Sequence, residues 1–313
     1  MIGTVLGQVT GQLEKRFILN ALFPTLVFVL AWVLAVAVGT DTGPLGPVER
    51  WENDSTGARV VIAIGVIAAV FLLANLLANR MQGVIRLFEG YGVRPRSLAD
   101  VGRRRQLARA RKLIDVATSS EDNAKREAAK NLFELSYPSF PQTLGKKNVA
   151  ATRLGNILRS AEAYGASRYG IDSVRIWSRL YPLLPDALTT SMVSARTSME
   201  FLLAVSFLAG IYAPLASLYL IGMNGPLVWT FSSLLGGTAI AVVTYHAAMQ
   251  PAAIYGETIR SAVDLYRLEL VKAMAKPLPK TMREETRTWR ELHLLFDRGT
   301  EDPNWHYVPK PDK

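Results

Sequence analysis

The stretch RMQGVIRLFEGYGVRPRSLADVGRRRQLARARK, residues 80–112, opens a long polar segment between two pairs of apolar runs. Each apolar run is about 19 to 22 residues long and contains no Asp, Glu, Lys or Arg; the runs cover residues 17–38, 60–78, 201–221 and 227–246. Helices of this length cross a hydrocarbon core of roughly 30 Å. The pattern predicts an all-α, polytopic membrane protein with four transmembrane helices arranged as two hairpins.

The overall composition agrees with a membrane protein. Of the 313 residues, 50% are hydrophobic, and the net charge is +10. The chain has no cysteine, which excludes a disulfide framework, a thiol nucleophile and a Cys-ligated metal site. A strongly basic chain can bind nucleic acid or anionic lipid, or its charge can set the membrane topology. The position of the charge along the chain decides among these roles.

The excess positive charge lies between the two predicted hairpins. Residues 80–196 hold 21 Lys and Arg against 10 Asp and Glu, whereas the loop at residues 40–59 is net negative. Basic loops stay on the cytoplasmic side, and Lys15 with Arg16 places the N-terminus there too. We therefore expect a multi-pass protein of the inner (plasma) membrane with both termini and a helical domain in the cytoplasm.

The first apolar run also has features of a secretory signal, because it follows a charged N-terminal region and Ala35-Val36-Ala37 near its end resembles a small-residue cleavage site. Its length favours an uncleaved signal anchor. Cleavage would remove the first span and leave the later topology unchanged.

These patterns divide the chain into six segments. Residues 1–16 place glycines at four-residue spacing on a helix that either lies at the membrane interface or packs around an oligomer axis. The segments are an amphipathic N-terminal helix (1–16), a first transmembrane hairpin (17–78), a basic helical cytoplasmic insert (79–198), a second transmembrane hairpin (199–248), cytoplasmic helices (249–298) and a tail (299–313).

Polar residues near the cytoplasmic ends of the spans are one candidate site. Asn20, Asn75, Asn79 and His246 share a depth under the predicted topology. Because polar side chains in spans avoid lipid, they form either a polar belt or pore mouth, or structural hydrogen bonds between helices. In the fourth span, a stripe of small residues at positions 233, 237 and 241 predicts close packing on the third span or on another subunit.

Basic residues of the insert are the second candidate site. Residues 103–117 and 120–135 read as a helical hairpin, with Ser119 or Ser120 as the cap of its second helix. The contacts expected for an anion, a lipid headgroup or a protein partner are Arg103, Arg104, Arg105, Arg109, Arg153 and Arg159. Nucleic acid is disfavoured, because no aromatic residues interleave with the charges and no binding module surrounds them.

Two further stretches are rich in Arg, Tyr, Trp and Gly. In residues 153–185, Arg153, Arg159, Glu162 and Asp172 form either an ion-pair network or an anion-binding niche, or the stretch is a structural corner that docks the insert against the spans. In residues 255–279, YGE at 255–257 and DLYR at 264–267 precede PLP at 277–279. Together the two stretches resemble a family of bacterial integral membrane proteins that carries no assigned activity.

The layout as a whole suggests a second resemblance. Two membrane hairpins that flank a long helical insert, with both termini inside, are similar to the bestrophin family of oligomeric ion channels. The resemblance concerns layout alone, because that family's pore-neck pattern does not align with this sequence.

No catalytic motif appears in the chain. HExxH, GxSxG and a Gly-rich phosphate loop are all missing from the sequence, so we expect no enzyme and no cofactor. Two functions remain. An oligomeric channel with a basic cytoplasmic vestibule is favoured, and a non-conducting scaffold or signalling subunit that recruits a partner or anionic lipid is the alternative. Expected partners are membrane lipids, further copies of the chain and a cytoplasmic protein.

Overall fold

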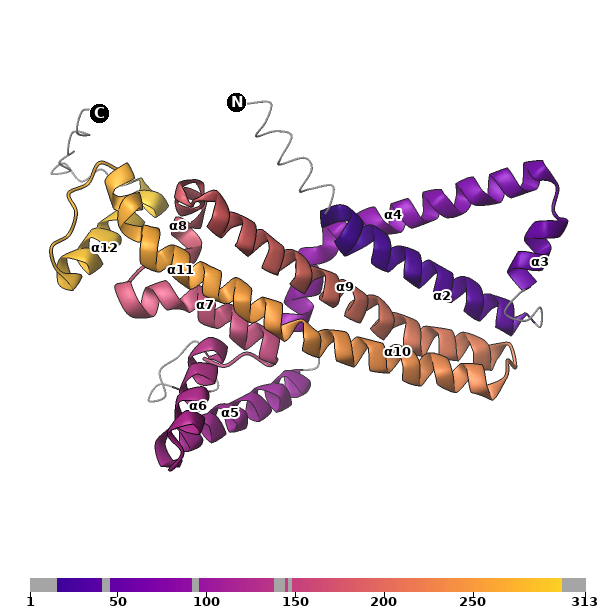
Figure 1. Ribbon diagram of the computed structural model, residues 1–313, viewed down its shortest axis with the longest axis horizontal. Coiled ribbons are helices and arrows are strands. Elements are labelled where there is room, and N and C mark those ends of the chain that lie inside the picture. The colour runs from indigo at the N-terminus through magenta and orange to yellow at the C-terminus, as the bar shows by residue number, and fades with distance from the viewer. Residues whose placement is uncertain (1–15, 41–45, 92–95, 138–143, 146–147, 300–313) are drawn as a thin grey trace. The chain divides into compact units, whose positions relative to one another are not determined.

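The computed structural model describes residues 16–40, 46–91, 96–137, 144–145 and 148–299. The predicted N-terminal helix, apart from Arg16, lies outside these residues, and so does the tail after residue 299. The described residues form helices and no strand, which confirms the all-α prediction. They divide into two compact units (Figure 1). The span unit is Met1–Arg86 with Thr197–Ala248, and the polar unit is Leu87–Arg196 with Met249–Lys313.

The span unit contains the apolar helices. Among the described residues, four helical stretches are long and apolar enough to cross a membrane: Ile18–Gly39, Thr56–Glu89, Asp186–Gly222 and Leu227–Ala273. The chain is therefore an integral membrane protein with several spans. The individual elements are a π-helical turn η1 (Ile18–Leu22), α2 (Phe23–Gly39), α3 (Gly46–Asn53), α4 (Thr56–Glu89), α9 (Asp186–Gly222) and α10 (Leu227–Ala247).

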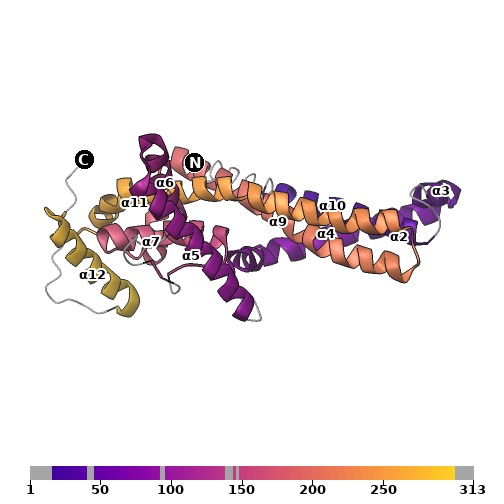
Figure 2. The ribbon, with the colours of Figure 1, turned by 90° about the horizontal axis from the view of Figure 1, so that it is seen from below.

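Helices α9 and α10 form a tight hairpin, and Figure 2 shows them side by side. Asn224 takes a φ of 52°, and the N–H of Gly225 donates to the Leu220 carbonyl at 2.8 Å. Asn tolerates this left-handed conformation, and Pro226 then precedes the first residue of α10.

The stripe of small residues on α10 faces α9. A Cβ atom added at Gly237 would lie 2.8 Å from the Cβ of Ala213. The hydroxyl of Ser206 donates to the Ala241 carbonyl at 2.8 Å. The small side chains let the two backbones approach closely, so the partner that the sequence left open is the third span.

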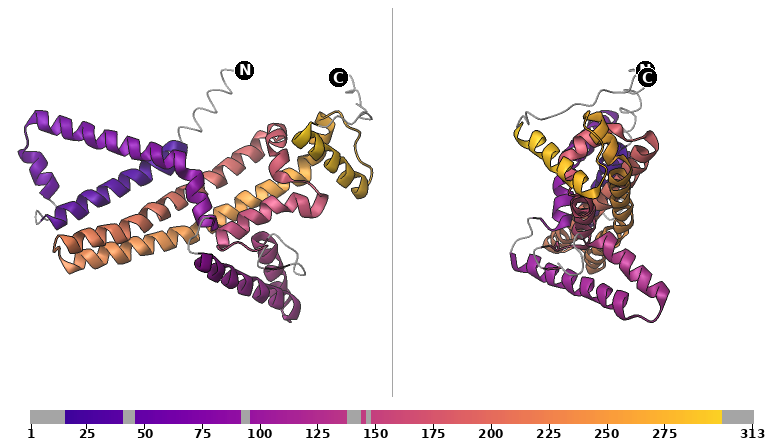
Figure 3. Two further views of the ribbon diagram at one scale, coloured as in Figure 1. Left: turned by 180° about the vertical axis from the view of Figure 1, so that it is seen from behind. Right: turned by 90° about the vertical axis from the view of Figure 1, so that its left-hand side faces the viewer.

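The polar unit consists of helices that carry more charged residues, and Figure 1 shows their packing, as does Figure 3 from behind. They are α5 (Arg96–Ser119), α6 (Asn123–Ser136), α7 (Arg153–Tyr169), α8 (Ser173–Leu180), the 3-10 turn η3 (Tyr181–Leu183), α11 (Met249–Ala273) and α12 (Met282–Arg298).

The predicted hairpin in the basic insert is α5 with α6, which pack on each other. Its first helix begins at Arg96 rather than Arg103. The cap of α6 is Asp122, not Ser119 or Ser120, since its carboxylate accepts from the N–H groups of Ala124 and Lys125. A carboxylate is also favoured there by the helix dipole.

The core of the polar unit joins segments far apart in the chain. Ile171, Ile176, Val263, Trp289 and Leu292 are completely buried in one cluster. They come from α8 and the turn before it, from α11 and from α12, while α7 packs along α11. Residues of the block at 153–185 thus pack against the C-terminal helices α11 and α12, and the predicted docking of this block against the spans stays a prediction.

Candidate functional site

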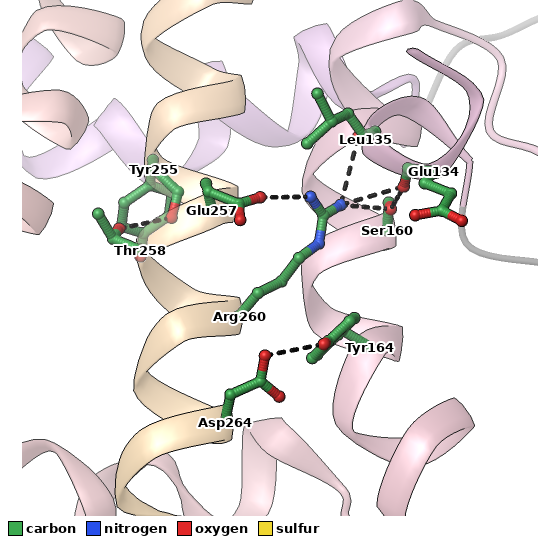
Figure 4. A network of polar contacts seen from close by, with 9 residues as sticks. All are labelled: Glu134, Leu135, Ser160, Tyr164, Tyr255, Glu257, Thr258, Arg260 and Asp264. Carbon is green, nitrogen blue, oxygen red and sulfur yellow. Dashed lines mark hydrogen bonds and ion pairs between the residues drawn. The ribbon is translucent and has the colours of Figure 1, made fainter. Parts of the chain in front are cut away.

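A buried arginine lies at the centre of the polar unit. Arg260 of α11 is 7% exposed. Its Nη1 donates to the Glu257 carboxylate at 3.0 Å, and its Nη2 donates to the Ser160 hydroxyl at 2.7 Å and to the carbonyls of Glu134 and Leu135 at 3.2 and 3.4 Å (Figure 4). The last carbonyls of a helix lack partners within it, and Arg260 supplies donors to two of them in α6. One side chain thereby ties α6 and α7 to α11.

An acidic residue one helical turn further on completes the network. Asp264 accepts hydrogen bonds from the hydroxyls of Tyr164 at 2.9 Å and Tyr169 at 2.7 Å. Burial, together with the hydrogen bond to Asp264, raises the pKa of Tyr164 to about 12. The guanidinium of Arg267 lies 3.9 Å from the centre of the Tyr169 ring, a cation–π contact. Both carboxylate oxygens of Asp264 are therefore occupied by neutral donors.

This network borders a cavity of about 680 Å³. Helices α5, α6, α7 and α11 and the residue after α6 all contribute to its wall. Its apolar and aromatic lining is Ile114, Ala117, Phe133, Leu135, Tyr137 and Tyr164, and its polar lining includes Lys130, Glu134, Ser160, Arg168, Glu257, Arg260 and Asp264.

The outer face of α5 is a second feature, here called the basic face: Arg104, Arg105, Arg109, Arg111 and Lys112. All five side chains are exposed, and none forms a hydrogen bond or ion pair with another described residue. Leu98 and Val101 on the same helix are 58% and 44% exposed. Arg103 differs, because it donates to Asp100 at 3.1 Å. The basic face is a surface of unpaired positive charge beside exposed apolar side chains.

The span unit holds a buried acid that the sequence analysis missed. Glu200 is 1% exposed. It accepts from Arg16 through both carboxylate oxygens and from the Asn20 amide at 3.0 Å. Asn20 belongs to the π-helical turn η1, and its side-chain oxygen is buried without a hydrogen bond. The available signal was that Arg16 and Glu200 each border an apolar run.

The residues of the predicted polar belt do not share hydrogen-bond partners. Asn20 bonds to Glu200; the Asn75 amide donates to the Phe71 carbonyl at 2.8 Å, and Nδ1 of His246 lies 2.8 Å from the Val242 carbonyl. Asn79 is exposed. Within the described spans no hydrogen bond joins these four side chains to one another, so a belt or pore mouth stays a prediction.

Arg153 and Arg159 are both half-buried in α7, the first at the start of the helix. Asp172, their predicted partner, instead caps α8 and pairs with Arg175 at 2.9 Å. Its backbone N–H donates to Nε2 of His293 in α12 at 3.2 Å. Asp172 therefore serves to join α8 to α12.

The sequence of α11 has an apolar face at Ile259 and Val263 and a polar side with Arg260 and Asp264, a pattern that predicts only local ion pairs for the charged residues. The helix is covered on that side as well, by α6 and α7, and this contact joins residues about a hundred positions apart. Among the described residues, no group of three or more His, Asp or Glu side chains could hold a metal ion. Comparisons of the chain with protein-family models, with curated proteins and with solved structures found no match.

Proposed function

We propose that the protein is a non-conducting membrane scaffold or signalling subunit whose polar unit lies in the cytoplasm and binds anionic lipid headgroups through the basic face. The protein acts by binding rather than by catalysis. The observation that carries this proposal is the set of five exposed cations on α5 that form no ion pair with any residue the structure describes, next to exposed Leu98 and Val101.

The physical chemistry of a membrane surface matches this face. Each Lys or Arg near an anionic surface contributes about 1 kcal/mol of attraction. Apolar side chains beside the charges add insertion into the headgroup boundary, as in interfacial helices. The cytoplasmic orientation of the polar unit follows from its excess of Lys and Arg.

The chain offers a direct test because it has no cysteine. A single Val101→Cys variant, labelled with an environment-sensitive fluorophore, is reconstituted into neutral and into phosphatidylglycerol-containing vesicles. We expect blue-shifted, stronger emission only with the anionic lipid. High salt, or replacement of Arg104, Arg105 and Arg111 by Gln, abolishes the change. A label at Asn123, an exposed position on α6, is the matched control. Identical emission in both lipids would refute the proposal.

The oligomeric channel is the second candidate. Asn79 directly follows the second apolar run, His246 ends the fourth, and both are exposed, so an oligomer would remove them from lipid. Chloride and potassium flux through liposomes, compared between the wild type and the variants His246→Ala and Asn79→Ala, separates the candidates. We expect no flux. Selective flux that either substitution alters would establish a channel instead.

A further inference from the structure

The two side chains of the ion pair between Arg260 and Glu257 differ in solvent exposure. The Arg260 side chain is 9% exposed, whereas that of Glu257 is 59% exposed. An exposed carboxylate gains little from such a pair, because water solvates it nearly as well. Glu257 can therefore turn away from Arg260, and Nη1 of the buried guanidinium then faces the cavity that both residues border.

The other donors of Arg260 are held in place. Nη2 is fixed by the Ser160 hydroxyl and by two carbonyl oxygens of α6, which carry no net charge. Asp264, the other acid close by, gives both oxygens to Tyr164 and Tyr169. Glu257 is thus the only carboxylate among the described residues that pairs with Arg260, and an incoming anion has one weak competitor to displace.

The rest of the cavity suits an apolar body. Phe133, Leu135 and Tyr137 line one side together with Ile114 and Ala117 of α5. A volume of about 680 Å³ is in the range of small-molecule sites, which combine apolar walls with a few polar groups. Arg168, which lies 5.6 Å from the centre of the Tyr164 ring, adds positive potential to the lining.

We propose that this cavity binds a small amphipathic anion, in which a phosphate or carboxylate group replaces the Glu257 carboxylate on Arg260 and an aromatic or aliphatic body packs against Phe133 and Tyr164. A planar guanidinium matches such oxyanions in geometry as well as in charge. The site goes beyond the proposed lipid contact and is independent of it, because no residue of the basic face lines the cavity.

Ligand-observed NMR of the full-length protein in neutral-lipid nanodiscs tests the proposal. The probes are 1-naphthyl phosphate and 1-naphthoate, and 1-naphthol is the neutral comparison; empty nanodiscs give the blank. We expect both anions to bind and the neutral probe to bind far more weakly. Glu257→Gln removes the competing charge and tightens binding of the anions by roughly threefold.

Glu269→Gln is the matched control. Glu269 is exposed on the same helix, pairs with Lys272 and does not line the cavity, so its substitution leaves the affinity unchanged. Arg260→Gln abolishes binding but also removes the bonds to α6 and α7. Ser167→Trp therefore provides a second variant, since Ser167 is an exposed lining residue and a bulky side chain there blocks the cavity.

Three results would overturn the site: no binding of either anion to the wild type and to Glu257→Gln, equal binding of the neutral probe, or equal effects of Glu257→Gln and Glu269→Gln. Addition of phosphatidylglycerol to the nanodiscs identifies the source of the anion. Displacement of the probe supports the site as one for a lipid headgroup, and retention supports it as one for a free anion. Neither outcome depends on the basic face.

Discussion

Glu200 and Arg16 lie 184 positions apart in the sequence, yet both carboxylate oxygens of Glu200 accept hydrogen bonds from the guanidinium of Arg16. The Glu200 side chain is 2% exposed and that of Arg16 is 31% exposed. A carboxylate this deeply buried depends on its partner, because water cannot replace the lost bonds.

Arg16→Met should therefore destabilise the span unit strongly. Breaking a buried pair costs about 3 to 5 kcal/mol, and because Arg16 is 31% exposed we expect a smaller loss of about 2 to 3 kcal/mol. Reversible unfolding in detergent by sodium dodecyl sulfate measures it. The double variant Arg16→Met, Glu200→Gln should recover most of the stability.

Arg103→Met is the control for this loss. Its ion pair with Asp100 is exposed on both sides, so the substitution should cost at most about 1 kcal/mol. Equal losses for Arg16→Met and Arg103→Met would show that Glu200 does not depend on Arg16.

Gly237→Ala should weaken the hairpin of α9 and α10. The new methyl group would lie 2.8 Å from the Cβ of Ala213, which is attached directly to the backbone of α9 and cannot rotate away. Overpacking of this kind costs about 1 to 3 kcal/mol. Thermal denaturation in nanodiscs measures the loss. Gly236→Ala meets no atom within 4 Å and should be neutral; a loss as large as that of Gly237→Ala would place the α9 contact elsewhere on α10.

The polar unit should lose stability in mildly acidic solution. Burial lowers the pKa of His293 below its usual value of 6.5, and Asp172 opposes the shift while Arg175 adds to it. Nε2 of the neutral ring accepts the N–H of Asp172. Below pH 6.5 the unfolded chain binds a proton that the folded chain does not, so the free energy of unfolding falls until the pH passes the lowered pKa.

Melting temperatures recorded between pH 7 and pH 5.5 test this dependence. His293→Gln cannot titrate in that range and should flatten the profile, although it lowers the melting temperature at pH 7 through the lost packing and hydrogen bond. An unchanged slope in His293→Gln would assign the dependence to another group.

Asn156→Asp should destabilise the polar unit, because it replaces the side-chain nitrogen, a hydrogen-bond donor, with an oxygen. The Asn156 amide nitrogen donates to the carbonyls of Ala150 and Thr152 at 3.2 and 2.8 Å, and the residue is 1% exposed. An aspartate places a charged acceptor against those two oxygens, at a cost of about 2 to 4 kcal/mol. Chemical denaturation followed by far-UV circular dichroism reports the change.

Asn123→Asp makes the same substitution at an exposed position in the first turn of α6. A negative charge in the first turn interacts favourably with the helix dipole, so we expect a neutral or slightly stabilising effect on the free energy of unfolding. If both substitutions cost the same, the buried bonds of Asn156 contribute little.

The sequence determined the elements of this protein that depend on local pattern. Uninterrupted apolar runs predicted the four spans, while Asn224-Gly225-Pro226 is a local signal for the turn before α10 and Thr281 with Glu284 is one for the start of α12. The Thr281 hydroxyl accepts the N–H of Glu284, and the Glu284 carboxylate accepts the backbone N–H of Lys280. Such signals act within a few residues, which is why one sequence suffices to read them.

Only the tertiary structure decided which charged residues are buried. Nothing in the local pattern separates Arg260, which is enclosed by α6 and α7, from Arg104, which is exposed on α5. The same holds for Glu200, which directly precedes the third apolar run and pairs with Arg16, which directly precedes the first. Burial of a charge depends on which helices pack around it, and contacts between distant segments leave no periodic trace in the chain.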